Sequence, residues 1–96
     1  MQAQFLPKAN NQITEIWLDL EAKRIGLGDD FLDELEVTID HVQQFPEGYI
    51  AISPNIRRLP MKRFKYSIFY HFDKEAQRID VVQILPQSAS PRRWPE

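Results

Sequence analysis

Residues 64–72 read FKYSIFYHF, and this stretch decides the fold. Apolar side chains stand at every second position, which is the period of a β-strand with one buried face. Two more strand-like runs flank it, at 56–60 (IRRLP) and 79–85 (IDVVQIL). Short turns separate the three runs, so we expect an antiparallel meander. A proline is tolerated only at an edge or a bulge, so Pro60 predicts that 56–60 is an edge strand.

Two helices are expected before these strands. In residues 9–24 apolar side chains recur three or four positions apart, which is typical of an amphipathic helix with one buried stripe. Gly26 and Gly28 are expected to break this helix. A pair of aspartates then opens a second helix over 29–44, because acidic groups suit the positive end of a helix dipole. The link is short, so the two helices should form an antiparallel hairpin.

The whole chain, residues 1–96, is expected to form one α+β domain. A weak first strand is expected within 1–7, followed by the helical hairpin over about 9–45, the β-meander over about 50–85 and a tail at 86–96. Helices followed by a meander favour a layer of helices packed on one face of a sheet.

Several classes of protein are disfavoured by the composition. No apolar stretch approaches the ~20 residues that cross a bilayer, so we expect no membrane partner. The opening residues, MQAQFLPKANNQ, lack the pattern of a signal peptide. The sequence has no cysteine, which suits a cytoplasmic protein.

Charge is divided unevenly along the chain. Residues 1–47 hold three basic and ten acidic residues, a net charge of −7, whereas residues 48–96 hold nine basic and four acidic residues, a net charge of +5. Five of the twelve basic residues fall within 57–65. A basic half can face nucleic acid or an acidic protein, although an ordinary solvated surface is the simpler interpretation.

No metal or cofactor site is expected. His41 and His71 are the two histidines, and neither has a partner at metal-ligand spacing. The sequence also contains no glycine-rich phosphate loop and no motif for a serine nucleophile.

The remaining candidate site is basic and aromatic. Its members are Arg57, Arg58, Lys62, Arg63, Lys65, Tyr66, Tyr70, Arg92, Arg93 and Trp94. Such residues can pair with phosphates and stack on bases, and they can also cleave RNA without a metal if their pKa values are tuned. The simpler alternatives are that Tyr66 and Tyr70 belong to the core, and that Trp94 covers a sheet edge.

Short motifs in a fixed order connect nearly the whole chain with a known family. They are LG-x-x-FL at 27–32, Pro46, the Arg57/Arg58 pair, RF-x-Y-x-I-x-Y at 63–70 and P-x-x-W at 91–94. In this order the sequence resembles the RelE/ParE superfamily of bacterial toxins, also called plasmid stabilisation proteins.

The resemblance implies both a fold and a function. The fold is β-α-α-β-β-β, with an N-terminal strand and the helical hairpin packed on a twisted antiparallel sheet of about four strands. The function is that of the toxin in a type II toxin–antitoxin pair, neutralised by a cognate antitoxin in a hetero-oligomer. RelE-like members cut mRNA in the ribosome, whereas ParE-like members poison DNA gyrase and are not nucleases.

The tail departs from the superfamily pattern. Many members carry His-x-Arg-Arg-x-Pro after the last strand, but here residues 86–91 read PQSASP. Pro86 stands at the histidine position, and Ser88 and Ala89 stand at the arginine positions. Proline and alanine can neither donate a proton nor pair with phosphate, so the tail argues against RNA cleavage.

Three functional hypotheses follow. The first is a ParE-like inhibitor that binds a protein target such as DNA gyrase and needs no catalytic residue. The second is a ribosome-dependent mRNA endonuclease that uses Arg57, Arg58, Arg63 and Tyr70. The third is a degenerate member that keeps the fold and the antitoxin but has lost toxicity. For the first, the expected binding surface comprises Arg57, Arg58, Lys62, Arg63, Lys65, Arg92, Arg93 and Trp94.

Overall fold

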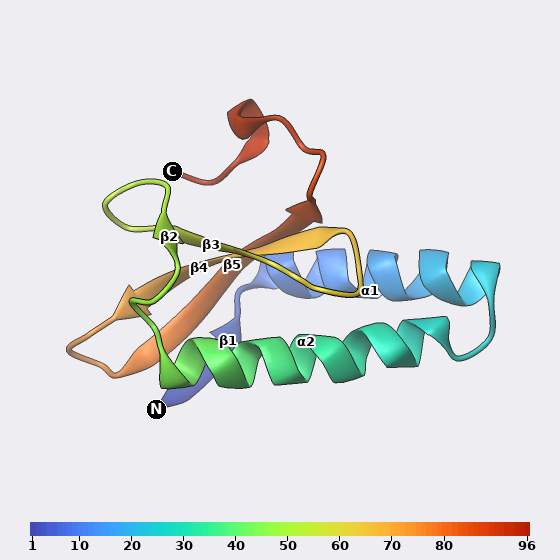
Figure 1. The fold of residues 1–96 in the computed structure, drawn as a ribbon, viewed down its shortest axis with the longest axis horizontal. Helices are drawn as coiled ribbons and strands as arrows, with labels where there is room; N and C mark the ends of the chain where they lie inside the picture. Colours follow the sequence, from blue (N-terminus) through green and yellow to red (C-terminus); the bar gives the residue numbers. More distant parts are fainter.

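The computed structural model describes residues 1–96, and the sheet lies between a pair of helices and a folded tail (Figure 1). The elements are β1 (Gln2–Phe5), α1 (Pro7–Lys23), α2 (Leu27–Gln44), β2 (Ile50–Ala51), β3 (Arg57–Pro60), β4 (Tyr66–Asp73), β5 (Arg78–Pro86) and the 3-10 helix η1 (Pro91–Arg93).

The sheet has five strands in the order β1-β5-β4-β3-β2. The expected meander is present, because β3, β4 and β5 pair antiparallel in chain order. The expectation of about four antiparallel strands was wrong in two respects. A short strand, β2, adds to β3, and β1 pairs parallel with β5. The helical hairpin connects β1 to the rest of the sheet, and such a crossover allows β1 to align parallel with the last strand.

The expectation that 56–60 is an edge strand was wrong for Arg57 and Arg58, which pair with β2, but Pro60 itself lies at the sheet edge. Strand β2 pairs only with Arg57 and Arg58, so no strand lies outside Pro60. The missing N–H of proline therefore leaves no unsatisfied partner there.

The helices form the expected hairpin, but the prediction that Gly28 ends a helix was wrong. Helix α2 already begins at Leu27, and only Gly26 lies in the turn, with a φ of +91°. Gly28 sits in the first turn of α2, where a Cβ atom would lie 2.6 Å from Cδ1 of Trp17. The glycine is therefore needed for close packing of the two helices rather than for termination.

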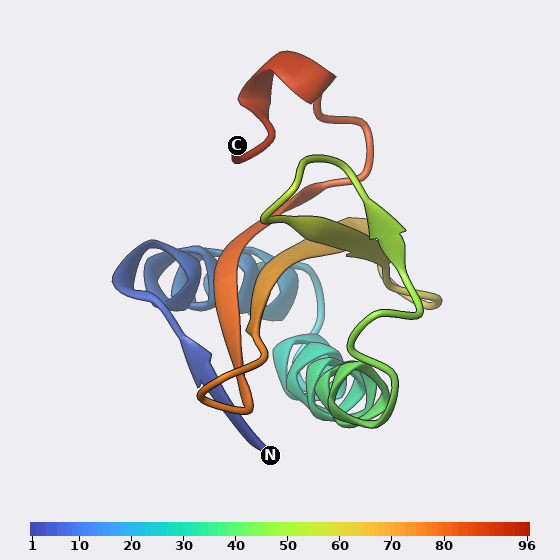
Figure 2. The same ribbon diagram turned by 90° about the vertical axis from the view of Figure 1, so that its left-hand side faces the viewer.

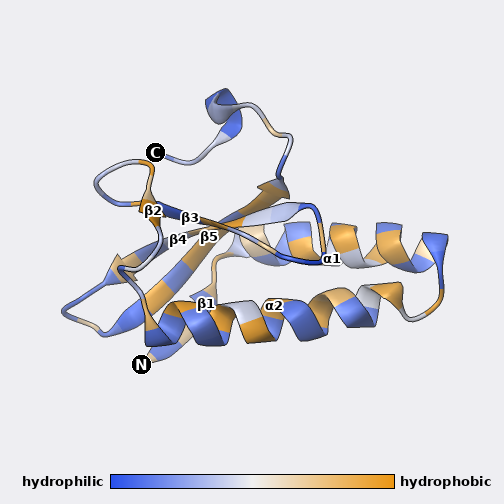
Figure 3. Cartoon of the chain, viewed as in Figure 1, coloured by the Kyte–Doolittle hydropathy of each residue, from blue (hydrophilic) through white to orange (hydrophobic).

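Both helices cover the same face of the sheet (Figure 2). Hydrophobic and hydrophilic residues alternate in bands along α1 and α2 (Figure 3), as expected for amphipathic helices. Thirteen buried residues form the core between the helices and the sheet, among them Phe31, Ile68 and Tyr70, which are fully buried. Neither helix has a segment long and apolar enough to cross a membrane.

The opposite face of the sheet carries a second, smaller cluster. Its buried members are Ile56, Phe69, Leu85 and Ala89, and Trp94 packs against them. The tail after β5 turns back over this face (Figure 2), so Trp94 packs against a face of the sheet rather than covering a sheet edge as expected.

Candidate functional site

The arginine pair of β3 is divided between the two faces of the sheet. In the β3–β4 register Arg57 is paired with Tyr70 on the helix side, and Arg58 is paired with Phe69 on the tail side. Side chains alternate along a strand, so neighbouring residues cannot reach the same face. The two arginines therefore do not form one phosphate-binding fork.

Arg57 holds the loop that follows α2. Its Nη1 donates to the carbonyl oxygens of Tyr49 at 2.6 Å and Glu47 at 3.2 Å. The same guanidinium lines an open pocket of about 310 Å3 together with His71 and Lys74. Lys74 is itself paired with Glu47 at 3.3 Å, so the positive charge of this pocket is partly neutralised.

Arg58 belongs to the tail-covered face. Its guanidinium lies 4.9 Å from the centroid of a Trp94 ring, a cation–π distance. Trp94 in turn packs on Phe69 with ring centroids 5.8 Å apart. Arg58 and Trp94 thus hold the tail on the sheet, and the Nε of Arg58 is buried without a hydrogen-bond partner.

Tyr70 is a core residue. It has no exposed surface, and its hydroxyl donates to the carbonyl oxygen of Pro46 at 2.7 Å. Burial raises the pKa of the Tyr70 phenol to about 12, although Arg57 acts in the opposite direction. A phenol with that pKa keeps its proton at neutral pH and has no path to a substrate.

Three more of the predicted cations lie in the loop between β3 and β4. Lys62, Arg63 and Lys65 are exposed. Lys62 borders one cavity beside α2, whereas Arg63 and Lys65 border a different cavity that they share with Lys23. None of the side chains of Lys23, Lys62, Arg63 and Lys65 forms an ion pair.

The remaining predicted residues lie in the tail, and they too are spread over different surroundings. Pro86 ends β5, Ser88 is exposed, and Ala89 is buried in the small cluster under the tail. Arg92 and Arg93 lie exposed on η1, and Arg93 faces a cavity that also contains Glu15 and Asp19.

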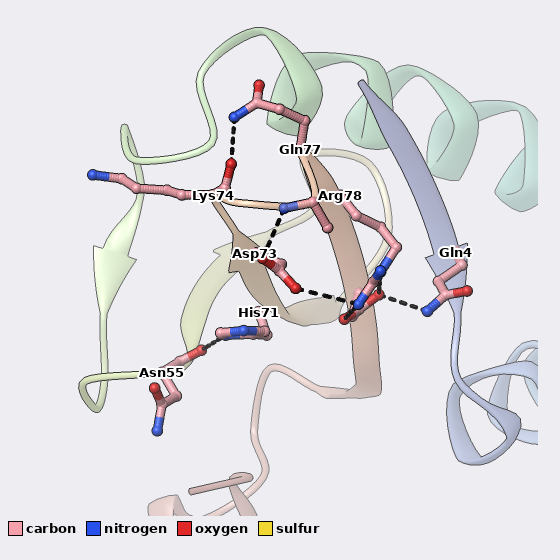
Figure 4. Close-up of polar contacts among 9 residues, drawn as sticks. Gln4, Asn55, His71, Asp73, Lys74, Gln77 and Arg78 are labelled. Atoms are coloured by element: carbon pink, nitrogen blue, oxygen red, sulfur yellow. Dashed lines mark hydrogen bonds and ion pairs between the residues drawn. The ribbon is translucent and has the colours of Figure 1, made fainter.

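A polar network connects the turn between β4 and β5 to the first strand (Figure 4). The nearly buried Asp80 accepts from Arg78 Nε at 2.8 Å and from Gln4 Nε2 at 2.7 Å. Hydrogen bonding from Arg78 lowers the pKa of Asp80. His71 lies nearby with its Nδ1 2.8 Å from the carbonyl oxygen of Asn55, so Nδ1 carries the proton. No three His, Cys, Asp or Glu side chains gather in a metal-binding arrangement.

Polar residues that sequence reasoning passed over organise the site. Gln87 Nε2 lies within 3.0 to 3.3 Å of the carbonyl oxygens of Met61, Phe64 and Tyr66. Gln12 Oε1 accepts from the Ile84 N–H at 2.7 Å, where β5 extends beyond β1. An isolated glutamine carries no periodic signal in the sequence, so its role emerges only with the fold.

Taken together, the structure separates the predicted constellation into an arginine that anchors a loop, an arginine that anchors the tail, a buried tyrosine and a cationic loop. Tyr70, Arg57 and Arg58 are engaged in contacts within the fold, and the surface cations of the loop between β3 and β4 are left to contact a partner.

Comparisons with known proteins agree with this fold. The model of the ParE toxin family, described as the ParE toxin of the type II toxin–antitoxin system parDE, matches residues 3–91. No curated protein sequence matches the chain significantly.

Solved structures resemble the chain in fold. The chromosomal ParDE system from P. aeruginosa matches with a TM-score of 0.71 and 19% identity, covering 90% of this chain and 95% of that one. The intact E. coli RelBE toxin–antitoxin complex matches at 0.66 and 14%, covering 88% and 93%. The isolated E. coli RelE toxin matches at 0.66 and 14%, covering 94% and 87%. The family match spans nearly the whole sequence, and the chain therefore belongs to the ParE toxin family of type II toxin–antitoxin systems.

Proposed function

We propose that this toxin acts by binding a protein target, with DNA gyrase as the first candidate, and does not cleave RNA. The observation that carries the proposal is the state of Tyr70. Its ring is fully buried, its hydroxyl is committed to the Pro46 carbonyl, and its pKa is about 12. The most plausible proton donor of an RNA-cleaving mechanism is thus part of the core.

The cations support the same proposal. A metal-free ribonuclease needs several positive groups around one phosphate to stabilise the charge of the transition state. Here Arg57 donates to two carbonyl oxygens of the loop after α2, and Arg58 stacks on Trp94 on the opposite face. Both are engaged in holding the fold, whereas inhibition by binding requires only a complementary surface.

A degenerate, non-toxic member remains the second candidate because of the tail. Ala89 stands where many superfamily members have an arginine, and its side chain is buried beneath the tail. A tail that has become part of the packing could support the fold and antitoxin binding alone. In either case we propose that the toxin works in the cytoplasm as part of a toxin–antitoxin hetero-oligomer.

Controlled expression without the cognate antitoxin separates these candidates. Growth arrest, with gyrase-dependent DNA cleavage complexes in a supercoiling assay using the purified toxin, is the expected result. Codon-linked cuts in translated mRNA, detected by primer extension, would contradict the proposal. Normal growth at full expression would favour the degenerate member.

The variant Tyr70→Phe adds a direct test of mechanism. It keeps the buried ring and removes only the hydroxyl, so toxicity should remain within about threefold after correction for the amount of folded protein. A loss of about 100-fold, in the range of a missing general acid, would assign Tyr70 a catalytic role.

A further inference from the structure

One surface cavity has only positively charged groups among its charged lining residues. It measures about 390 Å3 and lies where the end of α1, the start of α2 and the loop between β3 and β4 meet. Lys23, Arg63 and Lys65 line it, and its nine lining residues include no carboxylate. We call it the cationic pocket. Four other cavities each have at least one carboxylate in their lining.

The floor of the cationic pocket is apolar and aromatic. Leu27, Phe64 and Tyr66 line it, and both aromatic rings are half-buried. They pack edge-on against Phe31, with centroids 5.5 Å from the Phe64 ring and 5.8 Å from the Tyr66 ring. A ligand that suits this pocket therefore combines negative charge with an apolar side chain.

The loop that carries two of the three cations is held firmly. The Arg63 N–H donates to both carboxylate oxygens of Glu34, at 3.0 and 3.2 Å. The side-chain amide of Gln87 donates to the carbonyl oxygens of Met61 and Phe64 in this loop and of Tyr66 at the start of β4. The backbone N–H of Gln87 donates to the Lys65 carbonyl at 2.9 Å. The pocket is thus formed before any partner arrives, which reduces the entropy cost of binding.

The opposite wall is fixed as well. Glu21 accepts hydrogen bonds from the N–H groups of Gly26 and Gly28, at 2.9 to 3.2 Å, and so closes the helical turn beside Lys23. Lys23, Arg63 and Lys65 form no ion pair, although the Arg63 guanidinium lies 5.7 Å from the Phe64 ring centroid. Rigid walls with unpaired charges are what a specific docking site requires.

The surroundings favour a short acidic segment over a nucleic-acid backbone. Burial is the main cause of the raised pKa of Tyr66, and the nearby Asp19 carboxylate raises it further. The Glu34 carboxylate accepts from the Arg63 N–H and so lies beside the loop between β3 and β4. The half of the chain that forms the hairpin has a net charge of −7. A long run of phosphates would meet this negative surface, whereas one or two carboxylates beside an apolar side chain would not.

We propose that the cationic pocket is a docking site for an acidic, apolar segment of the cognate antitoxin. Membership of the toxin family supplies the partner, and charge complementarity supplies the site. The inference is independent of the cellular target, so it holds whether the toxin acts on gyrase or on another protein.

A matched pair of charge reversals tests the proposal. The pocket variant is Lys23→Glu with Arg63→Glu, and the control is Lys8→Glu with Arg92→Glu. All four residues are exposed, and both variants replace one lysine and one arginine with glutamate, so net charge changes equally. Isothermal titration calorimetry against the purified antitoxin should show binding weakened about 30-fold or more in the pocket variant. The control should change by less than about threefold.

Thermal unfolding verifies that both variants are folded. If the pocket variant melts early, the milder Lys23→Met with Arg63→Met takes its place, with Lys8→Met and Arg92→Met as the new control. Equal weakening in pocket and control variants, or no weakening in either, would overturn the proposal.

Cellular assays separate this proposal from the proposed function. Lys23 lines the pocket but lies outside the binding surface expected for the cellular target. Lys23→Glu alone should therefore remain toxic when expressed without the antitoxin, and the antitoxin should restore growth less effectively. Loss of toxicity with unchanged antitoxin affinity would assign the pocket to the cellular target and overturn the inference.

Overlapping peptides from the antitoxin identify the segment. An acidic, apolar peptide should bind the toxin and the control variant but not the pocket variant. Replacing its carboxylates with lysine should restore affinity for the pocket variant. If no peptide binds, but a short RNA or inorganic phosphate does and loses affinity in the pocket variant, the pocket is a phosphate site instead.

Discussion

The two faces of the sheet are covered in different ways. On one face two long amphipathic helices bury a cluster of 13 residues, and on the other a short tail and a loop bury a cluster of four. The helix face is closed by regular elements whose apolar side chains recur with the helical period. The tail face is closed by Trp94, an arginine stacked upon it and a buried alanine.

The face that should contribute most to the free energy of unfolding is therefore not the face where the sequence departs from the superfamily pattern. Burial of apolar area is the main favourable term in folding, so the larger cluster should carry most of the free energy of unfolding. The tail face contributes less, and it is also where the sequence departs from the superfamily pattern. A tail that contributes little to stability can change its residues without losing the fold.

The largest effect is expected at the centre of the helix face. Phe31 is fully buried and packs edge-on against Phe64 and Tyr66, so Phe31→Ala should lower the free energy of unfolding by about 3–5 kcal/mol. Leu18, which is 56% exposed, provides the control, and Leu18→Ala should cost about 0.5 kcal/mol or less. Urea denaturation measures both. Similar losses in the two variants would mean that the helix face does not dominate stability.

The contact between the helices gives the next largest effect. Gly28→Ala adds a Cβ atom 2.6 Å from Trp17 Cδ1 and 2.7 Å from its Nε1, so the Trp17 ring or one of the helices must shift. Overpacking of this kind should cost about 1–3 kcal/mol. Combining it with Trp17→Leu should recover much of the loss relative to Trp17→Leu alone. If the two costs simply add in a double-mutant cycle, steric conflict with Trp17 is not the cause.

Regular patterns explain how much the sequence revealed. The helical stripes and the alternation of residues 64–72 predicted the hairpin and the meander, and the motif order predicted the family. Strand β2 has only two residues and no detectable period, and the parallel pairing of β1 depends on contacts distant in sequence. Adjacent arginines looked like one site because a sequence does not show which face of a strand each residue occupies. In the same way, Gln87 and Glu34 became visible only through their backbone partners.

The tail face is tested by removing its aromatic anchor. Trp94 is only half-buried, so Trp94→Ala should lower the free energy of unfolding by about 1–2 kcal/mol, less than Phe31→Ala. Hydrogen exchange should accelerate at the N–H groups of Ala89 and residue 94, whose hydrogen bonds lie within the tail, and remain unchanged in α2. Global acceleration would show that the tail supports the whole fold. Arg93→Ala, at an exposed position of η1, is the control and should leave exchange unaltered.

The smallest effect is expected from the polar network beyond the tail, and it should depend on pH. The pKa of Asp80 in the folded chain lies below its ordinary value, chiefly because Arg78 donates a hydrogen bond to it. The folded chain therefore binds this proton less readily than the unfolded chain, and the stabilisation is complete above the ordinary pKa and is lost as the pH falls through the folded pKa. Asp80→Asn should accordingly destabilise the toxin at pH 7, and the difference from the natural chain should shrink in acid. The Arg78 side chain is 34% exposed, so solvent screens the pair and the loss at pH 7 should be smaller than that of Trp94→Ala.

Urea denaturation at neutral and at acidic pH measures this dependence of stability on pH. Glu75→Gln is the control, because Glu75 is exposed on the same turn and forms no ion pair. If the difference between the two chains persists unchanged into acid, Asp80 acts through its shape and through hydrogen bonds that do not need its charge. The part of the sheet around Asp80 would then depend on packing, as the helix face does.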